Sequence, residues 1–503
     1  MDNADDFRLD LVFGDIDLEV TTKWLTINET LGKRSLVVEQ AHAKYGAVVR
    51  LAPNELSFSD RVCVKELYLA GSKFPKSRRY EGFASTTRAS FDMTKVHEHR
   101  IRRNLVRHVL AQSHIDEAEP LISDQVRKAL PWIKHSSGSS LDVMLWMRRV
   151  MLDTAGGLFL GRSFGALEDD TPPAFLDDLD DYFAITALRW LAPWILGVLQ
   201  ILPVVPIQRF LQAQHRCYLY GRKAFDEYIE QHGRYSGRID LLTKMVGSKG
   251  YQRMTDEEIS NELGSLLVGA TDTTVVVSTW MLWELAQRPE WQRELRTELR
   301  DNKVAFSNGV PPYKEIKSLP ILDGFVLECM RLHPAQSIGL PRIACTNAAS
   351  IGGIVIPQGT YVSVPSREVH ADPEVYPSPH SFLPERWINA RSAAADFASA
   401  DQNAKTSSSQ PSVTPSNHFK TMQSSLLIWS KGSRACLGQY VATMELKFVL
   451  ASLVNGWNVE LDEDTKGKSG NGRGRGECME QTDYFLAFPR GRKCGIVFTP
   501  AME

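Results

Sequence analysis

One long helical segment places the strongest constraint on the fold. Thr255 can cap a helix start with its hydroxyl while Glu258, three residues later, reaches back to it, which is the pattern of a capping box. The helical pattern then continues to Arg288, and Pro289 ends it. At about 1.5 Å per residue such a helix is roughly 50 Å long, enough to cross a whole domain. The sequence therefore predicts a domain built around this helix.

The composition is that of a soluble globular protein with a large core. Hydrophobic residues make up 43% and charged residues 23% of the 503 positions, close to average usage. Lys and Arg total 58 against 60 for Asp and Glu, so the chain lacks the positive field that drives nucleic-acid binding. The seven cysteines include no Cys-x-x-Cys pair and are odd in number, which excludes a disulfide framework and a zinc ribbon. This usage favours a reducing compartment, where one cysteine can remain a free thiolate.

The remaining chain is mostly helical, with strand signals at two places. Residues 48–51 and 56–58 flank a Pro-Asn turn and predict a hairpin, whereas residues 96–333 carry helical periodicity. Residues 349–356 and 360–364 predict a second small sheet. Residues 391–421 are rich in Ser, Ala, Thr, Asn and Gln and predict a flexible insertion.

An apolar stretch from Trp190 to Ile207 has Gln200 as its only polar side chain and reaches the length of a membrane span. Proline and glycine interrupt it, which disfavours a regular span and leaves contact with a membrane surface or burial in the core as alternatives. The first thirty residues contain no basic region followed by an apolar run. We therefore expect neither a signal peptide nor an N-terminal anchor, and interpret residues 1–42 as a segment without an anchor helix.

The segment from Trp429 to Gly438 places Cys436 at the start of a helix whose apolar face continues to Phe448. Free backbone N–H groups and the positive end of the helix dipole stabilise a thiolate at such a position, because they lower the pKa of the thiol. A buried cysteine without a ligand role is the alternative. The segment combines Gly432, Arg434, Cys436 and Gly438. Four given residue types at these fixed offsets arise by chance with a probability of roughly one in a thousand per chain, which disfavours that alternative.

This segment resembles the cysteine loop of the cytochrome P450 family, Phe-x-x-Gly-x-Arg-x-Cys-x-Gly, with Trp429 in place of the Phe. The resemblance implies that Cys436 is the thiolate ligand of the iron of haem b. It also implies that Trp429 covers the thiolate, that Arg434 pairs with a haem propionate, and that Gly438 lets the backbone approach the macrocycle closely.

Two further segments match the family. Glu328 and Arg331 lie three residues apart on one helix face, and Arg386 follows in Pro384-Glu385-Arg386-Trp387. The resemblance implies a buried network of these three side chains with a structural role. Surface ion pairs at that spacing are common, so the Glu and Arg alone are a weak signal.

Within the long helix, Gly269-Ala270-Thr271-Asp272-Thr273-Thr274 is a polar run in an apolar segment. It resembles the family pattern Ala/Gly-Gly-x-Asp/Glu-Thr-Thr/Ser, with Ala270 in place of the second Gly. The resemblance implies that Asp272 and Thr273 deliver protons during oxygen activation. The alternative is that the Thr hydroxyls only bond back to the preceding helical turn.

The family's other contacts are carried over residue by residue. His99 and Arg103 resemble a fungal form of the Trp-x-x-x-Arg motif and are candidate propionate partners, with a plain basic helix face as the alternative. Arg342 in Leu340-Pro341-Arg342 resembles a third propionate partner. The candidate substrate pocket comprises Gly269, Ala270, Ser337, Ile338, Tyr484 and Phe485.

The resemblance runs from about Ala43 to Phe488 and implies one haem-thiolate monooxygenase domain at 43–503. The implied fold is mainly α with small β-sheets, a single large cytochrome P450 fold in which the long central helix crosses the haem. The implied activity inserts one atom of O2 into a lipophilic or aromatic small molecule in fungal secondary metabolism, with NADPH-cytochrome P450 reductase as partner.

We also expect a monomer that binds no nucleic acid. It is expected on the cytoplasmic side, soluble or peripherally associated with the endoplasmic reticulum, with weak membrane-surface contact. A reductase-independent haem-thiolate isomerase or dehydratase, and a non-catalytic haem-binding sensor, are the alternatives.

Overall fold

The computed structural model describes residues 22–84, 87–246, 254–347, 349–403, 415–466 and 477–501. The first helices are α1 (Lys23–Thr30), α2 (Arg34–Tyr45), α3 (Arg61–Tyr68), the 3-10 helix η1 (Arg78–Phe83), α4 (Val96–Val109), α5 (Gln112–Glu117), α6 (Glu119–His135), α7 (Val143–Phe159), α8 (Ala174–Leu191), α9 (Pro193–Ile201), α10 (Val205–Leu211), α11 (Ala213–His232) and α12 (Leu241–Val246). The others are α13 (Asp256–Ala286), α14 (Pro289–Asp301), α15 (Tyr313–Ile316), α16 (Pro320–Leu332), α17 (Ser366–His370), α18 (Glu385–Asn403), α19 (Pro415–Ser425), η2 (Gly432–Arg434), α20 (Gln439–Gly456), α21 (Glu463–Lys466) and η3 (Glu477–Met479).

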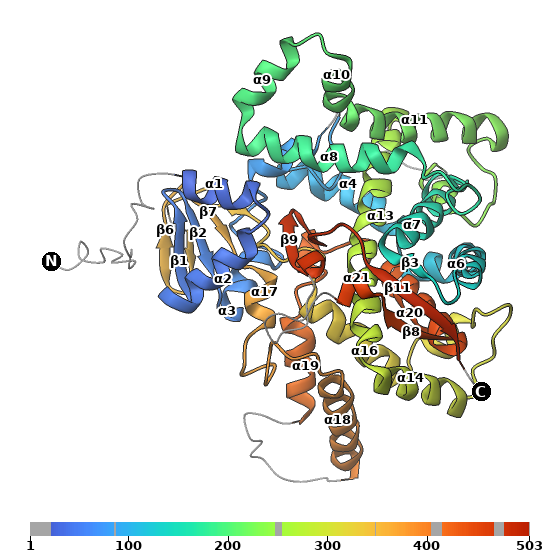
Figure 1. Cartoon of the computed structure of the whole chain (residues 1–503). Coiled ribbons are helices and arrows are strands. Elements are labelled where there is room, and N and C mark those ends of the chain that lie inside the picture. Colours follow the sequence, from blue (N-terminus) through green and yellow to red (C-terminus); the bar gives the residue numbers. More distant parts are fainter. Residues whose placement is uncertain are drawn as a thin grey trace.

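The predicted long helix is α13, which runs through the interior of the molecule (Figure 1). Its start has the predicted capping box, with the Thr255 side chain bonded to the Glu258 backbone and the Glu258 side chain bonded back to Thr255. Helices α7 and α11 pack along it, and α16 and α20 contact its other sides. Its side chains are almost all buried because neighbours surround it, which confirms its predicted central place.

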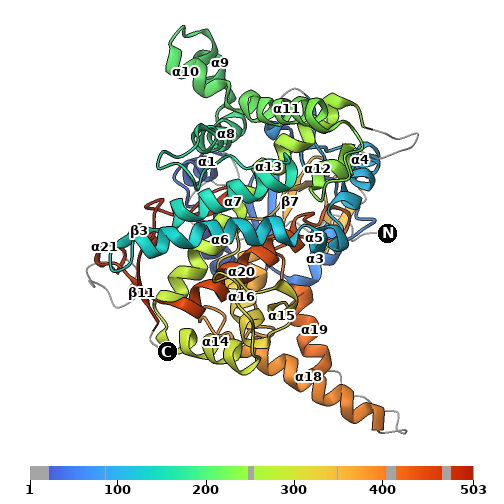
Figure 2. The same ribbon diagram turned by 90° about the vertical axis from the view of Figure 1, so that its right-hand side faces the viewer.

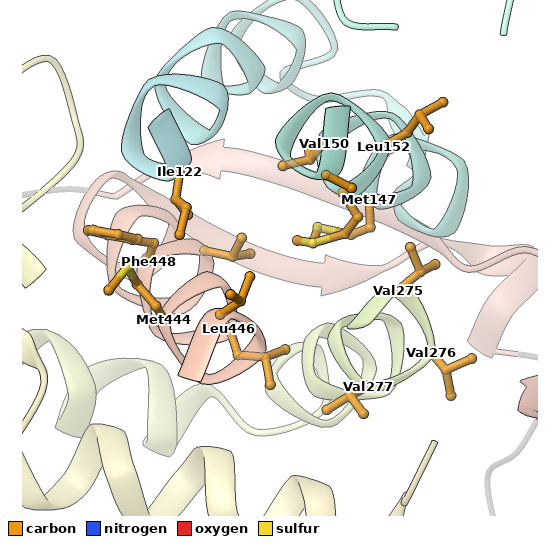
Figure 3. Packing of buried hydrophobic residues seen from close by; sticks show 14 of the residues in the cluster. Ile122, Met147, Val150, Leu152, Val275, Val276, Val277, Met444, Leu446 and Phe448 are labelled. Atoms are coloured by element: carbon orange, nitrogen blue, oxygen red, sulfur yellow. The ribbon is translucent and has the colours of Figure 1, made fainter. Parts of the chain in front are cut away.

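The main hydrophobic core lies where four helices meet. Figure 3 shows apolar side chains of this cluster, with these residues labelled: Ile122 of α6; Met147, Val150 and Leu152 of α7; Val275, Val276 and Val277 of α13; Met444, Leu446 and Phe448 of α20. In that view Val275 points toward α7, and Met444 and Phe448 lie near Ile122. These contacts hold the start of α20 in a fixed position relative to the middle of α13.

The strands form small sheets at the edges of the helical body. They are β1 (Val48–Ala52), β2 (Glu55–Phe58), β3 (Ser140–Asp142), β4 (Arg342–Ile343), β5 (Ala349–Ile351), β6 (Ile354–Ile356), β7 (Tyr361–Ser363), β8 (Trp457–Leu461), β9 (Gln481–Tyr484), β10 (Leu486–Pro489) and β11 (Gly495–Pro500). Their orders are β1-β2-β7-β4, β3-β11-β8, β10-β9 and β5-β6.

The predicted hairpin is β1–β2, with Val48 opposite Phe58. The second predicted sheet is only partly as expected. Strands β5 and β6 form a separate hairpin, but β7 leaves them and pairs in parallel with β2 of the first sheet. Local sequence identifies strands but does not choose their partners, because pairing depends on distant residues.

The region predicted as a flexible insertion, residues 391–421, is helical wherever the structure describes it. Helix α18 continues to Asn403 and α19 begins at Pro415, and residues 404–414 of the predicted insertion lie outside the described part. The two helices pack against each other and project from the body (Figures 1 and 2). The alanines of this segment favour helix, because alanine has the highest helix propensity, and the flexibility of the insertion stays a prediction.

The apolar stretch from Trp190 to Ile207 forms the end of α8, all of α9 and the start of α10. Helices α9 and α10 project from the body (Figure 2), and most of their side chains are not buried in the core. The α8–α9 pair would be long and apolar enough for a span, but it bends by 117°. Among the described residues one single helix, α13, passes the same test, and 72% of its apolar window is buried inside the protein.

Candidate functional site

Cys436 lies in the loop between η2 and α20, at the helix start that the sequence predicted. Its backbone N–H donates to the carbonyl of Trp429 at 2.7 Å, which closes the loop. Burial raises the pKa of the Cys436 thiol, while N–H groups of Gly438 and Gln439 and the positive charge of Arg103 act to lower it. Gly438 is the residue that caps α20. The loop therefore surrounds the sulfur with groups that favour a thiolate, and a bound metal cation would deprotonate it fully.

Five basic side chains from distant parts of the chain gather around this loop. They are Lys76, His99 and Arg103 of α4, Arg342 of β4, and Arg434. Burial, and then the charges of its neighbours, lower the pKa of Lys76 well below its usual value and that of His99 to about 3. The same causes lower the pKa of Arg434 to about 10. The cluster thus holds more buried positive charge than nearby acids neutralise.

One atom of this cluster has no partner. Arg434 donates through Nη1 to the carbonyl of Met93 at 2.7 Å, but its buried Nη2 has no hydrogen-bond partner among the described residues. Burial destabilises the anion of the nearby Asp92 and so raises its pKa to about 7. Buried cations without counter-charges are costly, so the cluster fits a ligand that brings carboxylates. The two propionates of haem b would meet that requirement.

The predicted propionate partners are placed in different ways. His99, Arg342 and Arg434 belong to the cluster, as predicted from the motifs. Arg103 also lies there, but its Nη2 donates to the carbonyl of Ala435 at 2.6 Å and so braces the cysteine loop. Lys76 lies in no recognisable motif and could not be predicted from the sequence, because the fold brings it to the cluster.

One face of α13 opens near its middle. Gly269 is exposed and Ala270 and Thr273 are half-buried, although the helix is otherwise almost wholly buried. These positions share a helical face, which is therefore free to line a ligand site. The Thr273 hydroxyl donates to the Gly269 carbonyl at 2.7 Å, the backward bond that the alternative interpretation expected.

Asp272, the residue before Thr273, is fully buried and points elsewhere. Arg148 of α7 binds its carboxylate with two hydrogen bonds, Nε to Oδ1 at 3.0 Å and Nη2 to Oδ2 at 2.8 Å. The same guanidinium donates to both carboxylate oxygens of Asp180 on α8, at 3.0 and 2.6 Å. Asp180 is partly exposed, so Arg148 connects the buried Asp272 to a group at the surface. The sequence contained no signal for Arg148.

Glu328, Arg331 and Arg386 come together in the interior. Arg331 donates to Glu328 through Nε at 2.9 Å and Nη2 at 2.7 Å, and Arg386 donates through Nε at 3.1 Å. Trp387, which sequence reasoning did not assign, donates to the same carboxylate at 2.8 Å. Arg331 also binds the carbonyls of His370 and Pro379, so the network holds the segment between α17 and α18 in place.

A cavity of about 110 Å³ lies between α8 and the β9–β10 turn. Ile338, Tyr484 and Phe485 line it, as predicted, together with Phe83 and Phe183. Gly269 and Ala270 are not among its lining residues. Ser337 is not either, but its hydroxyl donates at 2.5 Å to Asp483, which does line the cavity. Ser337 thus contacts a residue of the cavity wall through a buried bond that its neighbours in sequence do not predict.

The comparisons with known proteins agree with this site. The sequence model of the family described as cytochrome P450 matches residues 19–486. The chain is 24% identical to the cytochrome P450 monooxygenase tazI of Aspergillus terreus, over 92% of this chain and 88% of that protein. It is 26% identical to the benzoate 4-monooxygenase bphA of Aspergillus niger, over 95% and 90%. It is 25% identical to the cytochrome P450 monooxygenase aneF of Aspergillus aculeatus, over 86% and 84%.

These relatives are named as fungal monooxygenases, which favours oxygen insertion in fungal secondary metabolism over the isomerase and sensor alternatives. The family's cofactor is haem b, and its reaction requires a small-molecule substrate, O2 and a reductase. The chain therefore belongs to the cytochrome P450 family, and it is a haem-dependent monooxygenase.

Proposed function

We propose that Cys436 would supply the thiolate ligand of the haem iron and that the surrounding basic cluster would hold the haem propionates. Haem b, when bound, supplies an iron centre for oxygen activation, and a thiolate ligand donates the electron density that favours O–O cleavage. The Gly438 and Gln439 N–H groups and the Arg103 charge stabilise the thiolate. The observation that carries the proposal is the excess of buried positive charge beside a cysteine at a helix start.

Five groups are assigned to the propionates and the loop. Arg434, with its free Nη2, and Arg342 supply positive charge. Lys76, whose pKa burial lowers, would gain its charge beside a propionate. His99 stays neutral at physiological pH, because its pKa is lowered to about 3, and supplies a ring N–H. Arg103 fixes the cysteine loop through Ala435. Trp429, which packs against the main core, is assigned to cover the thiolate.

Proton movement is assigned to Thr273 and Asp272. The Thr273 hydroxyl lies on the open face of α13, where it can pass a proton at Oγ1. Asp272 is sealed from solvent and held by Arg148, so proton exchange with bulk water requires the ion pair to loosen toward Asp180. In this arrangement the two hydrogen bonds from Arg148 fix the orientation of the Asp272 carboxylate.

Thr273→Ala should uncouple NADPH consumption from product formation. A positioned proton donor contributes roughly 10²–10⁴-fold to a proton-transfer step, so product per NADPH should fall about tenfold or more while hydrogen peroxide rises. The measurement compares NADPH use, product and peroxide in the reconstituted holoenzyme. Thr271→Ala is the matched control, because Thr271 makes the same backward bond, to Leu267 at 2.8 Å, but is fully buried. Equal uncoupling in both variants, or in neither, would remove Thr273 from the mechanism.

The cavity indicates the chemical character of the substrate. Its walls carry the rings of Phe83, Phe183 and Phe485 and the side chain of Ile338. Apolar walls of this kind bind ligands chiefly by removing apolar surface from water. We propose a lipophilic or aromatic small molecule as the substrate.

We also propose peripheral attachment to the cytoplasmic side of the endoplasmic reticulum through α9 and α10. Trp194, Ile201 and Val205 are 72%, 78% and 79% exposed on these projecting helices (Figure 2). Tryptophan favours the headgroup region of a bilayer, and short apolar helices lie within that interface rather than span it. Trp190, which also lines the cavity, lies just before α9, so attachment would place a cavity wall near dissolved lipophilic molecules.

The double variant Trp194→Asp/Ile201→Asp should lower binding to lipid vesicles at least tenfold, because burying each apolar side chain contributes roughly 1.5–3 kcal/mol. Vesicles of phosphatidylcholine and phosphatidylserine in a flotation assay provide the measurement. Val355→Asp, at an exposed apolar position on β6, is the control and should leave binding unchanged. Wild-type protein that fails to float would contradict membrane contact, and retention after a carbonate wash would indicate a deeper insertion.

A further inference from the structure

The turn between β9 and β10 is unusually tight. Leu486 pairs directly with Tyr484, so Phe485 alone reverses the chain. Its φ is +82°, in the left-handed region that residues with a side chain rarely adopt. Such a conformation is unfavourable and persists only where surrounding contacts hold it. Phe485 is therefore a strained residue, and its neighbours must provide the restraint.

The ring of Phe485 reaches the cavity, which Asp483 and Tyr484 also line. Its centroid lies 4.9 Å from that of Phe83 and 6.2 Å from that of Phe183, on which it stacks. A third ring, Phe91, lies at 6.4 Å in an edge-on arrangement. A small rotation of the turn would move this ring relative to all three. The shape of the cavity thus depends on how firmly the turn is held.

The restraint on the first strand comes from Asp483. This carboxylate is 5% exposed, and both of its oxygens are occupied. Oδ1 accepts from Ser337 at 2.5 Å and from Gln481 at 3.1 Å, and Oδ2 accepts from Ser35. Asp483 lines the cavity, and these bonds within the protein use its carboxylate to hold the strand.

The backbone next to Asp483 binds the turn between α1 and α2. Its N–H donates to the carbonyl of Gly32 at 2.8 Å. The ring of Tyr484 covers Gly32 so closely that a Cβ there would lie 2.8 Å from the ring, and Gly32 itself has a φ of +64°. A segment far from the cysteine loop, with Ser35 on α2 beside it, is therefore fitted to β9.

The second strand of the turn is held independently. The N–H of Ala487 donates to the carbonyl of Ala335 at 2.9 Å, and its carbonyl accepts from the indole of Trp280 on α13 at 3.0 Å. Strand β10 is fixed to the central helix. The position of Phe485 therefore depends on how firmly the other strand of the turn, β9, is held.

We propose that Asp483 is a positioning residue that determines substrate specificity, because it fixes the Phe485 ring in the cavity by tying β9 to Ser35 and Ser337. The α1–α2 segment thereby acts on ligand selection through the bond from Ser35 to Asp483, beside Glu29 and Arg34, which line the cavity themselves. The inference rests on the proposed function in one respect, that the cavity beside Phe485 receives the organic ligand.

The test measures ligand binding to the ferric holoenzyme with imidazole, 4-phenylimidazole and 4-(biphenyl-4-yl)imidazole, by the change in haem absorbance. Asp483→Asn keeps the volume of the side chain but replaces one acceptor with a donor that faces hydroxyl or amide donors. The Kd of the aryl probes should rise about fivefold, while the Kd of imidazole stays within about twofold. Phe485→Ala should raise the aryl Kd by at least as much.

A double-mutant cycle separates positioning from general weakening. In the Phe485→Ala background, Asp483→Asn should change the aryl Kd by less than about twofold, because the ring it positions is gone. Glu298→Gln is the matched control, since Glu298 is another buried carboxylate, which accepts the N–H groups of Ile321 and Leu322 far from the turn. It should lower the thermal midpoint without changing the ratio of aryl to imidazole Kd.

Ser35→Ala and Ser337→Ala keep the proposal testable if Asp483→Asn fails to fold. Each should raise the ratio of aryl Kd to imidazole Kd, as Asp483→Asn does. Equal effects of Asp483→Asn with and without the Phe485 ring, or an equal shift in Glu298→Gln, would overturn the proposal. If Phe485→Ala changed no Kd, the cavity itself would be wrongly assigned. If Phe485→Ala changed the aryl Kd but Asp483→Asn did not, the cavity would stand and the proposal for Asp483 would fail.

Discussion

Glu328→Gln is expected to destabilise the protein by about 3–5 kcal/mol, the range for a buried ion pair that loses one partner. The carboxylate is fully buried and receives bonds from Arg331, Arg386, Trp387 and the backbone N–H of Leu383. Glutamine keeps the shape but removes the charge, so two buried guanidinium groups lose the anion that they share. The segment that leads to α18 and on to the cysteine loop would lose its anchor.

Urea unfolding followed by circular dichroism, together with the haem content of the purified protein, measures this effect. We expect a lower midpoint and a haem content far below that of the wild type. The control is Glu480→Gln, which removes one partner of the exposed Glu480–Arg490 pair at 2.9 Å. Exposed pairs contribute about 0–1 kcal/mol, so this variant should behave like the wild type. A change below about 1 kcal/mol for Glu328→Gln would show that the network is not a stability element.

The parts of the site that could be predicted are those whose chemistry is local in sequence. The capping box of α13 and the helix start after Cys436 each depend on residues within four positions, and both are present. The Glu328 and Arg331 pair depends on a three-residue spacing on one helix, which also fixes its geometry. In such cases the backbone bonds themselves bring the groups together.

The parts that were missed depend on contacts between distant segments. Lys76 and Arg148 have no motif around them and reach the site because packed helices and strands bring them there. Ser337 binds Asp483, which lies 146 positions later. The partner of β7 is likewise a strand about 300 residues earlier. Tertiary packing decides each of these, and no window of the sequence contains the information.

Cys436→Ala is expected to have the largest effect on the site, complete loss of thiolate ligation. The other six cysteines have different surroundings. Cys63, Cys217, Cys329 and Cys494 are packed within the hydrophobic clusters of the core. Cys345 and Cys478 donate to the backbone carbonyls of Ile343 and Asp464. We therefore expect none of the six to replace Cys436.

The absorption spectrum of the reduced carbonyl complex tests the central claim most directly, because the position of its main band reports whether a thiolate is bound opposite the carbonyl ligand. Wild-type holoenzyme and a Cys345→Ser control should both give the thiolate-type band. Cys436→Ala, reconstituted with haem b, should give no thiolate-type band at any pH at which it remains folded. A thiolate-type band that persists in Cys436→Ala would contradict the assignment of Cys436 as the ligand.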